Sequence, residues 1–166
     1  TLADFGLNTI YIKIAKENEV THLRPLFGLR ILIGISLALI AITIVYFLPY
    51  NPIDQTGFSP LVKAGVVIAS ATIITQALFT TANAFFQKIL RYDLSAIAAA
   101  SGYSVVLAWA IIVSLGSKSL LGYTTAYVLG GITLVLVAYV FIARRVGQFF
   151  TPAFSQKEFL AFIKPA

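Results

Sequence analysis

Long runs of apolar residues separated by short polar segments dominate the sequence. A helix needs roughly 20 apolar residues to cross a hydrocarbon core of about 30 Å. Four segments reach this length, and a fifth, at the start of the chain, is shorter. The predicted spans are residues about 1–15, 29–50, 61–87, 94–115 and 121–143. The pattern predicts an all-α fold, a polytopic transmembrane helix bundle of about five spans.

The connections between these spans are short and rich in turn-forming residues, so neighbouring spans should be antiparallel. Residues 1–146 are therefore predicted to form one membrane domain. The remaining residues, 147–166, differ in pattern. Ser155 and Glu158 form a capping box ahead of Phe159, Leu160, Phe162 and Ile163. This pattern predicts a short amphipathic helix in a cytoplasmic linker, or equally the lead-in to a further span.

Composition supports a membrane location and excludes several kinds of chemistry. The chain is 59% hydrophobic and 11% charged, unlike an ordinary soluble domain. It contains no methionine, so we expect an internal segment of a longer protein. With no cysteine and one histidine, His22, we expect no disulfide and no metal site. No nucleophile with a base, carboxylate pair or phosphate-binding glycine loop is evident, so we expect a carrier rather than an enzyme, without a cofactor.

The distribution of positive charge predicts the orientation. If loops alternate sides, ten Lys and Arg residues share one side, and only Lys63 and Lys118 lie on the other. The positive-inside rule then puts the basic side in the cytoplasm. The net charge of +6 is thereby explained by insertion and by anionic membrane lipids, and nucleic acid is not an expected partner.

Polar residues within the spans are candidate ligand-binding residues, because unpaired polar groups are unfavourable in hydrocarbon. In the first span, Asp4, Asn8 and Tyr11 share one helical face. They could line a cavity or pair with a neighbouring helix. Lys13, near the inner end, could bind a ligand or extend to the headgroups.

A longer polar stripe follows one face of the third span. Its members are Thr72, Gln76, Thr80, Asn83 and Gln87. They could hydrogen-bond to neighbouring helices, or they could line a wet cavity that contacts a hydroxyl-rich ligand. Small residues in the fourth and fifth spans, including Gly102, Gly130 and Gly131, are expected to allow close helix packing.

One stretch carries a family resemblance. Residues 3–8, Ala-Asp-Phe-Gly-Leu-Asn, and 12–16, Ile-Lys-Ile-Ala-Lys, resemble the second helix of polysaccharide flippases of the O-antigen and teichoic-acid type. These belong to the multidrug/oligosaccharidyl-lipid/polysaccharide exporter superfamily. The resemblance continues through Arg30, residues 47–49, residues 86–88 and residues 159–165. It implies helices two to six in the N-terminal lobe of a two-lobe transporter, whose C-terminal lobe would be a necessary partner.

The implied activity is translocation of an undecaprenyl-pyrophosphate-linked oligosaccharide across the cytoplasmic membrane. In such flippases, cationic cavity residues attract the pyrophosphate and polar residues contact sugar. Family members often carry Arg where Lys13 stands, and lysine lacks bidentate phosphate recognition. The candidate substrate-binding residues are Asp4, Asn8, Lys13, Gln76, Thr80, Asn83 and Gln87. The alternatives are a cation-coupled multidrug exporter of the same superfamily and a structural membrane subunit.

Overall fold

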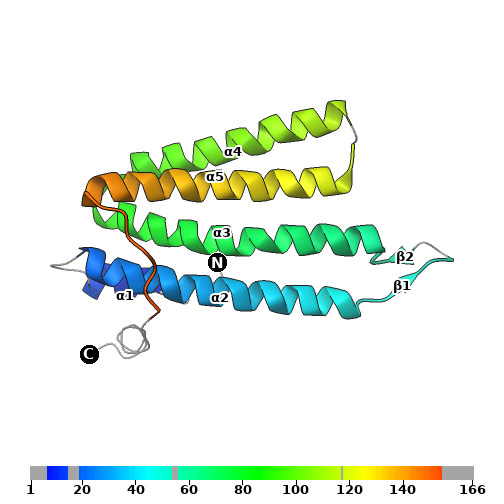
Figure 1. Ribbon diagram of the computed structural model, residues 1–166, viewed down its shortest axis with the longest axis horizontal. Coiled ribbons are helices and arrows are strands. Elements are labelled where there is room, and N and C mark those ends of the chain that lie inside the picture. The colour runs from blue at the N-terminus through cyan, green and yellow to red at the C-terminus, as the bar shows by residue number, and fades with distance from the viewer. Residues whose placement is uncertain (1–6, 15–18, 54–55, 117, 155–166) are drawn as a thin grey trace.

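Helices make up most of the protein in the computed structural model, which describes residues 7–14, 19–53, 56–116 and 118–154 (Figure 1). The helices are α1 (Leu7–Ile14), α2 (Glu19–Phe47), α3 (Pro60–Lys88), α4 (Tyr92–Leu115) and α5 (Leu120–Val146). Between α2 and α3 lies a short antiparallel pair, β1 (Tyr50–Asn51) and β2 (Thr56–Gly57), in which Tyr50 is opposite Gly57. Ser59 caps α3 by accepting a hydrogen bond from the backbone N–H of Val62, and Pro60 follows it at the first helical position.

Four of these helices are long and apolar enough to cross a membrane: α2 from His22, α3, α4 and α5. The prediction of an all-α polytopic bundle is thereby confirmed, and the chain is a multi-pass membrane protein. The described part of the first predicted span is the eight-residue helix α1. Residues 1–6, which include Asp4, lie outside the described residues.

The long helices lie side by side in the order α4, α5, α3, α2, and sequence neighbours run antiparallel, as predicted (Figure 1). α1 packs beside α2 and also contacts α3. This arrangement brings most described basic residues to one end of the bundle, which we call the basic end. They are Arg24, Arg30, Lys88, Arg91, Arg144 and Arg145, whereas Lys63 and Lys118 lie at the opposite end.

α2 begins at Glu19, well before the predicted start at about residue 29. The additional turns contain the buried side chains of Leu23, Leu26 and Phe27, and Pro25 is completely buried among them. A proline inside a helix removes one backbone hydrogen bond and normally favours a break. Here the burial of apolar side chains on both sides of Pro25 outweighs that local preference.

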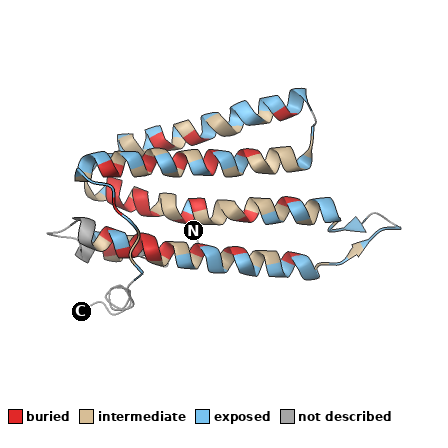
Figure 2. Ribbon diagram, viewed as in Figure 1, coloured by how far each residue is buried: buried red, intermediate tan, exposed pale blue. Residues whose placement is uncertain are grey.

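Burial is concentrated at the basic end (Figure 2). The hydrophobic core joins Tyr11 of α1, Phe85 and Phe86 of α3, and Ile142 of α5 with the start of α2. Away from this region many large apolar side chains are exposed, such as Leu39 on α2. In a membrane span these side chains face hydrocarbon, so their exposure is favourable.

Glycines allow α5 to pack closely on its two neighbours. A Cβ on Gly102 of α4 would lie 2.8 Å from the carbonyl oxygen of Gly130, and a Cβ on Gly131 would lie 2.4 Å from the hydroxyl of Thr75 on α3. The expectation of close packing at these small residues is confirmed. Such contacts are typical of helix pairs in membranes.

After α5, residues 148–154 cross the basic end from α5 to α2, and we call this segment the strap (Figure 1). Phe150 is buried, with ring centroids 5.6 Å from Phe27 and 5.0 Å from Tyr139. The Arg24 side chain donates from Nε to the carbonyl of Thr151 at 3.0 Å. The backbone carbonyl of Arg24 accepts a hydrogen bond from the N–H of Ala153 at 3.1 Å. The predicted amphipathic helix beyond the strap, in residues 155–166, lies outside the described residues.

Candidate functional site

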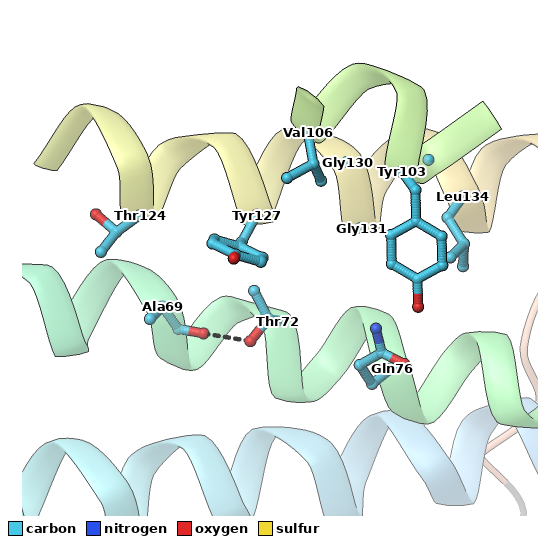
Figure 3. A pocket seen from close by; sticks show the side chains of 11 residues that line it. Ala69, Thr72, Gln76, Tyr103, Val106, Thr124, Tyr127, Gly130, Gly131 and Leu134 are labelled. Carbon is cyan, nitrogen blue, oxygen red and sulfur yellow. Dashed lines mark hydrogen bonds between the residues drawn. The ribbon is translucent and has the colours of Figure 1, made fainter. Parts of the chain in front are cut away.

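A pocket of about 300 Å³ lies between α3, α4 and α5 (Figure 3). Its size is at the lower end of the range of roughly 300–1,000 Å³ that is usual for small-molecule sites. The lining residues combine small, aromatic and uncharged polar side chains. They are Ala69, Thr72 and Gln76 of α3, Gly102, Tyr103 and Val106 of α4, and Thr124, Tyr127, Gly130, Gly131 and Leu134 of α5.

The pocket lies near the middle of all three helices. Gln76 is close to the centre of α3, Tyr103 is close to the centre of α4, and Gly131 is close to the centre of α5. Because each of these helices is long enough to cross the bilayer, the pocket is at the depth of the membrane midplane. Carriers commonly bind their substrates at this depth.

The two threonines in the pocket donate their hydroxyl protons to backbone carbonyls of their own helices. The hydroxyl of Thr72 donates to the carbonyl of Ala69 at 2.6 Å, and that of Thr124 donates to the carbonyl of Leu121 at 2.9 Å. Each hydroxyl has one proton, so these bonds leave oxygen lone pairs available. The threonines can therefore accept hydrogen bonds from a ligand that carries hydroxyl groups.

Three other polar groups in the pocket make no hydrogen bond to the described residues: the Gln76 amide and the Tyr103 and Tyr127 hydroxyls. Figure 3 shows the Tyr103 ring extending from α4 toward Gln76 on α3. Hydrocarbon offers no partner for such groups, and leaving them unpaired there is costly. Water or a polar ligand in the pocket would satisfy all three.

The rest of the stripe on α3 does not reach this pocket. The Thr80 hydroxyl donates to the carbonyl of Gln76 at 2.7 Å within its own helix. Asn83 accepts a hydrogen bond from the hydroxyl of Ser95 on α4. Gln87 is exposed at the basic end. The two interpretations of the stripe therefore apply to different residues: Gln76 and Thr72 line a cavity, whereas Asn83 bonds to a neighbouring helix.

A second polar group lies at the basic end. Arg30 of α2 is completely buried and donates from Nη2 to the Asn8 side-chain oxygen at 2.6 Å. Tyr11, three residues after Asn8 on α1, lies under the ammonium of Lys88, which is 5.9 Å from the ring centroid. Gln76 and Lys88 are about 18 Å apart along α3, at 1.5 Å per residue. The structure therefore separates Asn8 from the midplane pocket.

The structure does not show the side chains of two other candidate substrate-binding residues. Asp4 lies outside the described residues, and the Lys13 side chain is not described although its backbone belongs to α1.

At the surface of the basic end, Arg91 and Asp93 form an exposed ion pair at 2.8 Å. Hydrogen bonding to this carboxylate raises the pKa of the Arg91 guanidinium. Exposed pairs of this kind contribute little to stability.

Sequence reasoning did not select Tyr103, Tyr127 or Arg30 as site residues. Tyrosine is common in membrane helices. Small residues indicated close packing in the fourth and fifth spans, but nothing in the sequence placed those spans against the polar face of the third. Arg30 stands near the predicted start of a span, where a headgroup contact is the ordinary expectation. The polar stripe was the one signal that identified part of the pocket.

Comparison with known proteins does not assign a family. No protein-family model, no curated protein and no solved structure matches this chain.

Proposed function

We propose that this chain belongs to a carrier in the cytoplasmic membrane that translocates undecaprenyl-pyrophosphate-linked oligosaccharide. The observation that carries the proposal is the midplane pocket with its uncharged hydrogen-bonding groups. A sugar both donates and accepts hydrogen bonds. It could donate to Thr72, accept from the Gln76 amide, and lie against the Tyr103 ring. The sequence resemblance at residues 3–8 supports the same substrate class.

The charge distribution fits this role. The positive-inside rule places the basic end in the cytoplasm, where the lipid-linked substrate is made. Arg24 and Arg145 are exposed there and would attract a pyrophosphate. None of the described residues that line the pocket is charged, which favours a neutral sugar over the cationic drugs of a multidrug exporter. A carboxylate would be expected in a site for such drugs.

The proposal can be tested in cells that lack the gene. Deletion should leave the lipid-linked repeat unit on the cytoplasmic face and remove surface glycan. Complementation with Gln76→Leu or Tyr103→Phe should lower glycan export about five- to tenfold, because each variant removes one hydrogen-bonding group of the pocket.

A matched control is Thr133→Val. Thr133 lies on α5 at similar depth, donates to the carbonyl of Leu129 at 2.9 Å, and does not line the pocket. Normal surface glycan in the deletion strain would refute the flippase proposal. Full export by both pocket variants, at protein levels equal to those of Thr133→Val, would refute the role of this pocket.

A further inference from the structure

A second pocket, of about 310 Å³, lies at the basic end where α5 leaves the membrane. It is lined by Val140, Ala143, Arg144, Gly147, Gln148 and Phe149. Arg144 lies about 15 Å beyond Leu134 along α5, at 1.5 Å per residue. This pocket is therefore distinct from the midplane pocket, and it does not depend on the function proposed for that site.

The end of α5 shapes this second pocket. Gly147 has a φ of +77° and donates its backbone N–H to the carbonyl of Ala143 at 2.9 Å. This left-handed residue turns the chain back, as is usual after a helix. Phe149 then stacks on Tyr139, with ring centroids 6.2 Å apart and an interplanar angle of 28°. The Tyr139 hydroxyl accepts a hydrogen bond from the backbone N–H of Phe150 at 3.1 Å. This bond fixes the chain next to Phe149, which forms one wall of the pocket.

The polar side chains of this pocket carry hydrogen-bond donors that are not bonded to any described residue. Arg144 and Gln148 are both exposed, and neither has a hydrogen-bond or ion-pair partner among the residues that the structure describes. A guanidinium offers a planar fork of N–H groups that matches the oxygens of a phosphate. Val140 and Ala143 lie next to these donors and provide an apolar surface.

The position of the pocket selects the kind of ligand. Arg144 is in the last turn of a membrane span, at the level of the lipid headgroups. The ring of Phe149 is 78% exposed there, and large aromatic side chains favour this interfacial region. The carbonyl end of α5 carries roughly half a negative charge, which disfavours anions. The charges of Arg144 and Arg145 in the same turn outweigh it.

We propose that this pocket binds the headgroup phosphate of an anionic phospholipid from the leaflet at the basic end. Arg144 and Gln148 donate to the phosphate oxygens. The first methylene groups of the acyl chain lie on Val140 and Ala143, and Phe149 covers the glycerol region. The ligand is a lipid rather than free phosphate because three of the six lining residues, Val140, Ala143 and Phe149, have apolar side chains.

The test measures lipid retention by the full-length protein in neutral detergent, using native mass spectrometry with phosphatidylglycerol and phosphatidylcholine of equal chain length. Both lipids carry the phosphate, but the choline ammonium neutralises phosphatidylcholine, so phosphatidylglycerol should bind more tightly to the arginine. Arg144→Gln should weaken its binding by about tenfold or more, as expected for a charge-assisted hydrogen bond. Arg145→Gln removes the same charge but does not line the pocket. It should weaken phosphatidylglycerol binding by at most roughly fivefold, the contribution of one arginine to general attraction by the membrane surface.

Gln148→Ala provides a second test that does not change charge. It should weaken phosphatidylglycerol binding about fivefold, the effect of losing one hydrogen bond from an uncharged donor, whereas purely electrostatic attraction predicts no change. The proposal is overturned by equal losses in the two arginine variants, by equal retention of the two lipids, or by an unchanged affinity in Gln148→Ala. It is also overturned if inorganic phosphate at the lipid concentration displaces phosphatidylglycerol completely.

Discussion

Arg30 and Asn8 connect two helices through a buried hydrogen bond of 2.6 Å. Arg30 belongs to α2 and is completely buried, and Asn8 belongs to α1. A buried guanidinium is costly unless acceptors surround it. The bond therefore does two things: it helps to satisfy a charge inside the bundle, and it holds the short helix α1 against α2.

Removing the acceptor should destabilise the bundle. Asn8→Ala should lower the free energy of unfolding by about 1–3 kcal/mol, because Arg30 stays buried with one acceptor fewer. Reversible unfolding in mixed detergent micelles measures this. Thr43→Ala is the control, since the Thr43 hydroxyl is exposed and bonds only within its own helix, to the carbonyl of Leu39. Equal stability of Asn8→Ala and the control would show that the bond contributes nothing.

Gly28 should be essential for the position of the strap. A Cβ on Gly28 would lie 2.0 Å from the carbonyl oxygen of Ala153, a backbone atom that can move only if the strap moves. Gly28→Ala should therefore lift the strap from α2. The chain has no native cysteine, so a single cysteine in place of Ala153 can report this as faster labelling by a water-soluble thiol reagent.

Gly65→Ala is the matched control for this experiment. Gly65 is also a buried helical glycine, but a Cβ there would meet its nearest neighbour, in Thr124, at an ordinary 3.5 Å. Labelling of the cysteine at 153 should be unchanged in this variant. If Gly28→Ala labels no faster than Gly65→Ala, the strap does not depend on close contact with α2.

Tyr139 should hold the other side of the strap. Its hydroxyl donates to the carbonyl of Phe150 and accepts the N–H of the same residue. Tyr139→Phe removes both bonds and should also expose the cysteine at 153. Because Gly28 and Tyr139 act on one segment, the effects of Gly28→Ala and Tyr139→Phe should not be additive. Fully additive labelling changes would indicate that the two contacts are independent.

Overpacking between α4 and α5 should be costly at Gly102. A Cβ there would lie 2.6 Å from the Cβ of Leu134 and 2.8 Å from the carbonyl oxygen of Gly130. Gly102→Ala should therefore lower the free energy of unfolding by about 1–3 kcal/mol. Gly65→Ala, measured in the same micelles, should change it far less. A stability equal to that of the parent chain would mean that α4 and α5 can separate without cost.

Local periodicity was sufficient to identify the helices and their alternation. Apolar runs the length of a bilayer determine four spans, and short polar connections force neighbours to be antiparallel. Ten basic residues against two indicated a common end before any packing was known, and the structure places the described ones accordingly. The exception is residues 19–28, which lie before the predicted start of the second span. Long-range packing of Leu23 and Phe27 makes them part of α2.

The amino-acid sequence by itself determined the membrane location, the number of long spans and a polar face on α3, because these depend on composition and period along one helix. Only the tertiary structure decided which part of that face is a pocket. Gln76 and Asn83 are the same kind of residue on the same helix, yet one faces Tyr103 in a cavity and the other meets Ser95. The difference depends on how α4 and α5 lie against α3, which is set by contacts between residues far apart in the chain.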